Sequence, residues 1–412
     1  MSSDPDPKRP YITISADTHA GAPLDVYRGY LDPSYRDEFD AWRKAYRNPS
    51  KKHIGGKKTK NWDTAERIAD LEADGVLGEV VFPNTVPPFY DTAFHVSAPP
   101  VPDRYEHWRA GIRAHNRWLA DWCQEAPERR AGIGLIHVND IDDAIEDVEW
   151  IAEHGLRGGV LLPLPPDDMK HILPLYAPEY DRLWARIQDC GLVMNQHSGA
   201  GTPDYGKYPA AHPMWILEVP FFSQRGFKQL ILGGVFERFP GLKYILTESG
   251  CAWVPSLLQR MDVVHAGIKA GMMGEMDYSQ VDTLPEPPSF YARRNCWYGA
   301  SFPSPSEIAD RHVVGVDRIL WGSDYPHYEG TFPYTRDALR LTFADIDPAE
   351  TRLMLGENAA NLYGFDLEAL APLAEKLGVT PDAVAEPLAE IPREATSPML
   401  RRERFQRREQ RS

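Results

Sequence analysis

The chain is organised around the stretch Tyr11-Ile12-Thr13-Ile14-Ser15-Ala16-Asp17-Thr18-His19-Ala20-Gly21. Its first half is rich in β-branched residues and predicts a strand over 11–15 that ends at the small residues after it. Side chains two positions apart on an extended chain point to the same face, so Asp17 and His19 should arrive together at the C-terminal end of this strand. A carboxylate beside an imidazole suits divalent zinc, manganese or iron, although two ligands do not complete a site and these residues also form turns and caps.

Length and composition restrict the class of protein. The 412 residues are enough for one large domain or two ordinary ones, and the formal charge of −15 argues against nucleic-acid or anionic-membrane partners. The four cysteines lie far apart with no Cys-x-x-Cys spacing, so they predict neither a zinc knot nor a disulfide scaffold. The first ten residues lack an apolar signal core, and no run of about 18 apolar residues follows. We therefore expect a cytoplasmic protein.

Strand and helix patterns alternate along most of the chain. The strands are expected at 11–15, 77–82, 132–138, 158–162, 192–197, 242–247, 296–299 and 318–324. Their continuous apolar character is typical of parallel strands that helices cover on both faces. Eight alternations predict a (β/α)8 (TIM) barrel with long insertions after the strands. A doubly wound open sheet would normally carry a glycine-rich phosphate turn after its first strand, and Asp17-Thr18-His19 is not one.

Two segments outside the alternation have open interpretations. We expect a barrel domain over 1–365 and a helical, arginine-rich C-terminal extension over 366–412. The extension is either a solvated terminus or a surface that docks on a neighbouring subunit, and the protein is expected to be a homodimer or a larger homo-oligomer. The lysine-rich segment Lys51 to Lys60 is either a solvated loop or a lid that contacts an anionic group of the substrate.

Polar residues recur where the predicted strands end. Asp17 and His19 follow strand one, His197 ends strand five, Glu248 follows strand six and Asp324 ends strand eight. The C-terminal ends of barrel strands meet in one pocket, whatever their separation in sequence. Each residue alone could be a buried histidine, a cap partner or a turn former, but the set predicts a site for one divalent metal ion.

Four blocks of sequence resemble the amidohydrolase superfamily, in the branch that holds aminocarboxymuconate-semialdehyde decarboxylase and resorcylate decarboxylase. They are Ser15-Ala16-Asp17-Thr18-His19, Gly233-Gly234-Val235-Phe236-Glu237-Arg238-Phe239-Pro240-Gly241-Leu242-Lys243, Trp321-Gly322-Ser323-Asp324-Tyr325-Pro326-His327 and Gly356-Glu357-Asn358-Ala359-Ala360-Asn361-Leu362-Tyr363-Gly364. The resemblance implies that Asp17, His19, His197 and Asp324 ligate one divalent metal ion. The family's first motif is usually His-x-His or Glu-x-His. The aspartate found at this position does not decide between zinc and manganese as the bound metal.

Glu248 guides the expected chemistry, because the resemblance places it where the decarboxylases commonly carry a histidine. We expect Glu248 to take a proton from a metal-bound water and Asp324 to share or relay it, with Asp324 or His327 as the alternative base. The predicted reaction is hydrolysis of an ester, thioester or amide. The substrate is expected to be a bulky apolar or aromatic small molecule, because several insertion residues would wall an apolar pocket: Phe82, Pro83, Phe89, Tyr90, Tyr205, Tyr208, Trp215, Phe221 and Phe222.

Two other functions remain open. The first is nonoxidative decarboxylation of an aromatic or unsaturated carboxylic acid, since one scaffold supports several chemistries. The second is a non-catalytic barrel that binds a metal or a ligand. Release of carbon dioxide from candidate acids, against release of acid from esters and thioesters, separates the first alternative from hydrolysis.

Overall fold

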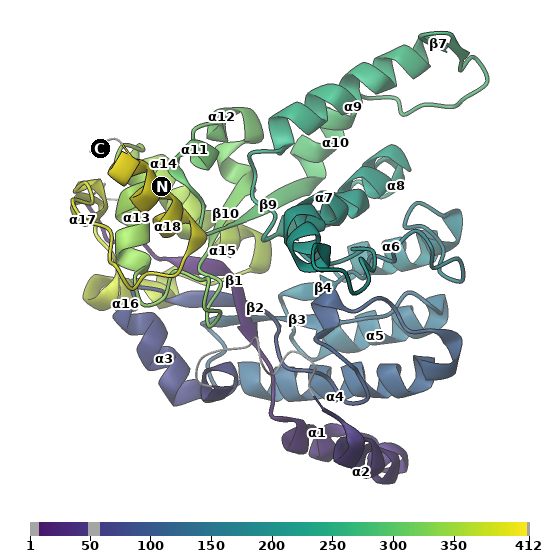
Figure 1. Ribbon diagram of the computed structural model, residues 1–412, viewed down its shortest axis with the longest axis horizontal. Coiled ribbons are helices and arrows are strands. Elements are labelled where there is room, and N and C mark those ends of the chain that lie inside the picture. Colours follow the sequence, from purple (N-terminus) through teal and green to yellow (C-terminus); the bar gives the residue numbers. More distant parts are fainter. Residues whose placement is uncertain (1–7, 48–57, 410–412) are drawn as a thin grey trace.

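The computed structural model describes residues 8–47 and 58–409, and its centre is an eight-stranded parallel barrel (Figure 1). Neighbouring strands pair in the order β1-β2-β3-β4-β5-β6-β9-β10. The strands are β1 (Ile14–Ala20), β2 (Gly78–Pro83), β3 (Arg130–Leu135), β4 (Gly159–Leu161), β5 (Val193–His197), β6 (Lys243–Thr247), β9 (Cys296–Ser301) and β10 (Ile319–Gly322). The residues Lys51 to Lys57 of the lysine-rich segment lie outside the described part of the chain.

The barrel closes between β1 and the residues that directly follow β10. The amide of Asp324 donates to the carbonyl of Asp17 at 2.9 Å, and the amide of His19 donates to the carbonyl of Tyr325 at 2.7 Å. Gly322 is needed at this seam, because a Cβ atom there would lie 2.6 Å from the Cβ of Asp17. The predicted (β/α)8 barrel is therefore confirmed, and its closure brings Asp324 beside the polar residues of β1.

The first strand differs from its predicted position. It runs from Ile14 to Ala20 and is buried along its whole length, so Asp17 and His19 lie within it and not beyond its end. The prediction ended the strand at Ser15 because small and polar residues follow, but backbone pairing on both sides keeps the chain extended. The four positions of β1 from Ser15 to Thr18 oppose three on β2, from Glu79 to Val81, which marks a β-bulge next to Asp17.

Helices surround the barrel (Figure 1). They are α1 (Leu24–Tyr30), α2 (Arg36–Ala45), α3 (Thr64–Ala73), α4 (Tyr105–Cys123), α5 (Ile141–Glu153), α6 (Asp181–Asp189), α7 (Ala211–Leu232), α8 (Val235–Arg238), α9 (Val254–Lys269), α10 (Pro288–Asn295), α11 (Pro305–Ile308), α12 (Arg311–Val314), α13 (Thr335–Phe343), α14 (Pro348–Arg352) and α15 (Asn358–Tyr363). The predicted third insertion, 270–289, carries the short hairpin β7 (Met272–Met273) and β8 (Met276–Asp277), which projects from the barrel with α9.

The segment predicted as a C-terminal extension contains α16 (Leu367–Leu377), α17 (Pro381–Ala385) and α18 (Pro398–Glu409). Leu388, Met399 and Leu400 form a small apolar cluster with Ala338 of α13, so the segment packs on the helical layer of the barrel. The domain boundary at 365 and the oligomeric state remain predictions. Within the described residues, none of the helices combines the length and the apolar character that crossing a membrane requires.

Candidate active site

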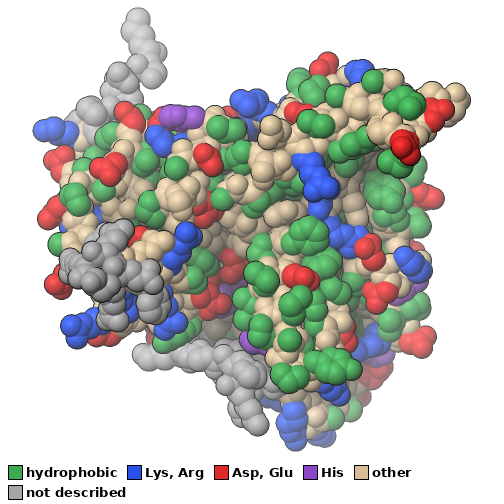
Figure 2. All heavy atoms as spheres, turned by 45° about the horizontal axis from the view of Figure 1, so that its top comes forward, with side chains coloured by type: hydrophobic (Ala, Val, Ile, Leu, Met, Phe, Trp, Pro, Cys, Tyr) green, Lys and Arg blue, Asp and Glu red, His purple; other side chains and the backbone are tan. Residues whose placement is uncertain are grey.

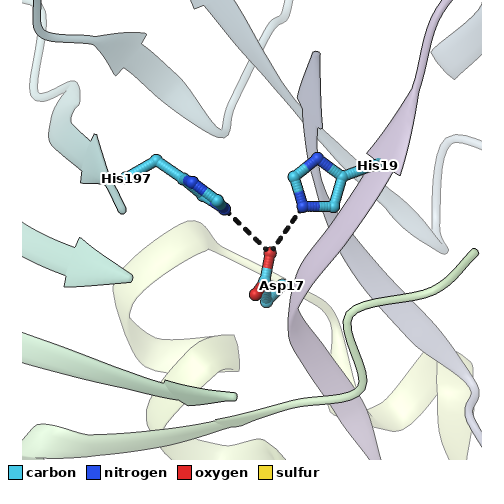
Figure 3. Close-up of side chains that lie close together, drawn as sticks. All are labelled: Asp17, His19 and His197. Carbon is cyan, nitrogen blue, oxygen red and sulfur yellow. Dashed lines mark ion pairs between the residues drawn. The ribbon is translucent and has the colours of Figure 1, made fainter. Parts of the chain in front are cut away.

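Residues from three strand segments meet at the C-terminal mouth of the barrel. His19 Nε2 lies 3.3 Å from Asp17 Oδ1 and 3.3 Å from Asp324 Oδ1, and His197 Nε2 lies 3.5 Å from Asp17 Oδ1. Figure 3 shows Asp17 between the two imidazole rings, each facing its carboxylate. All four side chains are buried, with at most 2% of any one exposed. The structure thus brings together every residue that the sequence predicts as a metal ligand.

Both imidazoles direct their Nε2 atom into this cluster. His19 Nδ1 lies 3.2 Å from the carbonyl of Pro83, and His197 Nδ1 lies 2.9 Å from the carbonyl of Ser198. A carbonyl only accepts, so Nδ1 carries a proton in each ring and Nε2 is the atom left to bind a further proton or a metal ion. Histidine ligands of metals are commonly oriented by such a bond from the other ring nitrogen.

Atoms inside the cluster lack hydrogen-bond partners. Asp17 Oδ1, His19 Nε2, His197 Nε2 and Asp324 Oδ2 are buried without one. Buried polar atoms are nearly always paired, because an unpaired one loses its interactions with water. Bonds of about 2.0–2.2 Å to one ion would place its ligand atoms about 3 Å apart, close to the separations observed. Asp17, His19 and His197 therefore offer atoms that fit a shared divalent cation.

The charges of the cluster also favour a cation. Burial and the nearby His327 lower the pKa of His19, but Asp17 and Asp324 outweigh them and raise that pKa to about 9. Burial raises the pKa of Asp17, and the two histidines reverse this and hold it well below its usual range. The two carboxylates thus stabilise positive charge among the imidazoles, whether a proton or a metal ion supplies it.

Asp324 is held by a second histidine. His327 Nδ1 lies 2.7 Å from Asp324 Oδ1, and His327 Nε2 lies 3.0 Å from Asn84 Oδ1, so the ring bridges the residues after β10 to those after β2. Burial lowers the pKa of His327, and Asp324 more than offsets this, which raises it to about 9. Asp324 itself adopts a φ of +59°. A residue other than glycine in this left-handed region is strained, and such strain concentrates at functional sites.

Glu248 follows β6 and stands at the edge of the cluster. Its Oε2 lies 3.6 Å from His197 Nδ1, and 22% of its side chain is exposed. Burial raises the pKa of Glu248 to about 8, and the negative charges of Asp324 and Asp17 add to this rise. The alternative role as a helix cap finds no support, because Trp253 occupies the N-cap of α9 and Glu248 makes no cap bond there.

An apolar pocket adjoins His197. Its walls include Phe94, Pro99, Leu161 and Leu164, and the space that its atoms leave free, counting the part open to solvent, is about 370 Å³. One face of the molecule is hollowed near its middle, with acidic side chains inside the hollow and hydrophobic ones along its edge (Figure 2). Its mostly apolar lining is typical of a pocket that binds a small organic molecule.

The aromatic residues expected to wall a pocket are only partly placed there. Tyr90 lines the pocket, and the ring of Phe82 packs on that of His197 at 4.7 Å between centroids. Tyr208 and Phe221 are mostly exposed, at 80% and 58%, so their expected role in the pocket is wrong. They lie in or before α7, whose N-terminal half turns apolar side chains to the surface.

Two histidines that line the pocket were not predicted from the sequence. His95, in the short 3-10 helix Phe94–Val96, lies near His19 and His197 with ring centroids 5.6 and 5.2 Å away and the rings inclined to one another. His137 also lines the pocket. The predicted third strand extends to Val138 and therefore includes His137. In the structure β3 ends at Leu135, so His137 lies just past the strand's C-terminal end. The general rule for barrel strand ends would have identified His137, but no local signal marked His95.

The chain was compared with known proteins. The model of a family described as amidohydrolase matches residues 62–365. A gamma-resorcylate decarboxylase from Rhodococcus jostii (strain RHA1) is 24% identical over 269 residues, which is 62% of this chain and 76% of that protein.

Among solved structures, 5-carboxyvanillate decarboxylase from Novosphingobium aromaticivorans DSM 12444, with manganese and 4-hydroxy-3-methoxy-5-nitrobenzoic acid, aligns with a TM-score of 0.64 and 20% identity over 88% of this chain and 100% of that chain. Dihydroxybenzoic acid decarboxylase from Polaromonas sp. JS666, with manganese and 2-nitroresorcinol, aligns with a TM-score of 0.59 and 18% identity over 85% and 96%. At these identities the structural likeness shows a shared fold.

These findings correct the main functional prediction. The matched relatives are decarboxylases of aromatic acids, so the prediction of an ester, thioester or amide hydrolase is wrong and the alternative of decarboxylation is favoured. The argument from Glu248 failed because a carboxyl group beside a metal site can move a proton in either reaction. The expected family is confirmed: since the family model spans most of the chain, from Trp62 to Phe365, the chain belongs to the amidohydrolase family.

Proposed function

We propose that this protein is a metal-dependent nonoxidative decarboxylase of an aromatic carboxylic acid. The observation that carries the proposal is the mostly apolar pocket that His197 lines, beside a buried cluster of unpartnered ligand atoms. The pocket accounts for an aromatic substrate and the cluster for a cation. The kind of reaction is taken from the decarboxylases that the chain resembles.

Asp17, His19, His197 and Asp324 are the proposed metal ligands. Manganese is the ion we favour, because it accepts a mixture of carboxylate and imidazole ligands and two of the related structures contain it. A bound divalent cation would polarise oxygen atoms of the substrate and stabilise the negative charge that develops in the reaction. Hydrogen bonds from Ser301 to Asp17 and from the two imidazoles to backbone carbonyls hold these ligands in place.

The reaction replaces a carboxylate by a hydrogen atom. The bond between the ring carbon and the carboxylate breaks, its electron pair stays on the ring carbon, and that carbon takes one proton as carbon dioxide leaves. No oxidant is consumed. Glu248 is the proposed proton donor, because its carboxyl group lies 3.6 Å from His197 and stays partly exposed. Asp324 and His327, which are hydrogen-bonded to each other, are proposed to orient the reacting group and to resupply the proton.

The test is an assay of the manganese-loaded protein with 2,6-dihydroxybenzoate in deuterated water. We expect carbon dioxide and an arene that carries one deuterium at the carbon that held the carboxylate, detected by proton NMR. Protein with His197→Ala serves as the control and should give neither product. Failure of a metal-loaded, folded protein to release carbon dioxide from any member of a panel of hydroxylated and methoxylated benzoates would contradict the proposal.

A further inference from the structure

The pocket contains a histidine that the proposed reaction does not use. His137 is 3% exposed and its Nε2 lies 2.8 Å from the hydroxyl of Tyr90, which is fully buried. Its Nδ1 is buried and has no hydrogen-bond partner. Both side chains line the pocket, which is also lined by His197, a proposed metal ligand. A ring bound against His197 would therefore have His137 and Tyr90 among its neighbours.

An unpartnered imidazole nitrogen does not by itself identify a binding site. His115 forms the same kind of pair, with Nδ1 2.8 Å from the hydroxyl of Tyr27 and an unpartnered Nε2, and it does not line the pocket. What distinguishes His137 is its position, because its side chain lines the pocket, where a bound ligand would lie next to it. The pair His115 and Tyr27 thus provides a natural control.

The pair His137 and Tyr90 is electrically neutral. Burial lowers the pKa of His137 to about 3 and raises that of Tyr90 well above its usual value, so neither ionises near neutral pH. Tyr90 is a hydrogen-bond donor to a neutral imidazole when Nδ1 carries the ring proton, which leaves that N–H without an acceptor. A neutral oxygen atom on the substrate would satisfy it.

The surroundings disfavour a charged substituent at this position. In the described part of the chain, no lysine or arginine lines the pocket. The two arginines whose charges act on the pair are bound to carboxylates: Arg104 lies 2.6 Å from Asp91, and Arg109 lies 2.8 Å from Asp143. A second carboxylate buried here would lack a counter-ion, and an unpaired buried charge is far more costly than a neutral group.

We propose that His137 is a specificity-determining residue that donates a hydrogen bond to a neutral hydroxyl or methoxyl oxygen on the substrate ring, remote from the metal. This inference rests on the proposed function and narrows its substrate class. The preferred acid carries one carboxylate and a remote neutral oxygen, and an acid with a second carboxylate at that position is rejected.

The test compares three acids that share a 2-hydroxybenzoate core: the parent, its ring-hydroxylated derivatives and its ring-carboxylated derivatives. Binding to the manganese-loaded protein is measured by calorimetry and turnover by carbon dioxide release. We expect the best hydroxylated acid to bind about 10- to 100-fold more tightly than the parent, and the carboxylated acids to bind more weakly than the parent. His137→Leu should reduce the ratio of hydroxylated to parent affinity to about 1 to 3, with metal content unchanged.

Two further variants keep this test decisive if His137→Leu folds poorly. His137→Asn retains an N–H close to the position of Nδ1 and should restore part of the ratio. His115→Leu, which breaks the matching pair outside the pocket, should leave the ratio unaltered. Equal affinity for the parent and hydroxylated acids, tighter binding of a dicarboxylate, or an unchanged ratio in His137→Leu would each overturn the inference. Discrimination in binding without carbon dioxide release would instead reject the proposed reaction and leave the role of His137 standing.

Discussion

Two buried groups of charged side chains lie on opposite faces of β1 and differ in how they are satisfied. On the outer face, Glu79 of β2 accepts hydrogen bonds from Arg67, Arg130 and Thr18, and Arg67 also donates to the carbonyl of His19 at 2.8 Å. On the inner face, the carboxylate and imidazole cluster at the barrel mouth has ligand atoms without partners. The comparison separates a closed cluster, whose charged atoms are paired, from an open one, whose unpartnered atoms are the proposed metal ligands.

The closed cluster also supports the open one. Arg67 fixes the backbone at His19, and Thr18 lies between the two proposed ligands of β1 with its hydroxyl 3.1 Å from Glu79. Burial alone would raise the pKa of Glu79, but Arg67 and Arg130 more than offset this and lower it. The bulged strand is thus anchored from outside, while its inward side chains remain available for binding.

The largest expected effect comes from removing a ligand of the open cluster. His197→Ala should lose bound manganese and reduce turnover to background, because the remaining atoms no longer surround the ion. The thermal unfolding temperature should stay close to that of wild-type protein stripped of metal. Elemental analysis and an activity assay on the same sample check the manganese content and the turnover. The control is His312→Ala, which changes an exposed histidine on α12. Full occupancy in His197→Ala would remove His197 from the ligand set.

A second change tests the proposed proton donor. Glu248→Gln keeps the size of the side chain and removes its acidic proton, so turnover should fall about 10²- to 10⁴-fold. Metal content and the unfolding temperature should change little, because Glu248 caps no helix. Steady-state carbon dioxide release, measured with metal analysis, gives the result. Normal turnover with a lowered unfolding temperature would assign Glu248 a structural role.

A substitution in the closed cluster should lower the free energy of unfolding. Glu79→Gln leaves Arg67 and Arg130 buried without a full counter-charge, and breaking a buried pair in this way costs about 3–5 kcal/mol. Urea unfolding of the variant and of the wild type measures this loss of unfolding free energy. Since the pKa of Glu79 is lowered in the fold, its contribution is present above the pKa of the unfolded carboxyl and is lost as the pH falls through the folded value.

A control for this change is Arg28→Ala, which removes an exposed ion pair with Asp40 and should leave the unfolding curve almost unaltered. If Glu79→Gln were as stable as wild type at neutral pH and showed the same acid dependence, the two clusters would not differ in the way described.

The smallest predicted effect concerns the support of a ligand. His327→Gln removes the ring that bridges Asp324 and Asn84, and loss of such a supporting partner typically weakens metal binding by about 10- to 100-fold. Titration with manganese against a competing chelator measures the change. An unaltered dissociation constant would show that Asp324 needs no support from His327.

Much of this arrangement could be predicted from the sequence. The strands that end at His197 and near Asp324 were placed correctly because parallel, buried strands have a strong apolar pattern. The extent of β1 could not be predicted, because its second half is polar and is held extended by residues such as Tyr325, more than 300 positions away in the chain. His95 and His137 were missed because loop packing and exact strand ends decide which side chains enter a pocket.

The central claim is that the unpartnered atoms of Asp17, His19, His197 and Asp324 surround one divalent ion. Anomalous X-ray diffraction at the manganese absorption edge, on crystals of the manganese-loaded protein, tests it most directly. The account predicts one strong peak within about 2.0–2.3 Å of an oxygen or nitrogen atom of each of the four side chains. A fully active protein whose manganese peak lies elsewhere, or whose barrel mouth shows no peak, would contradict it.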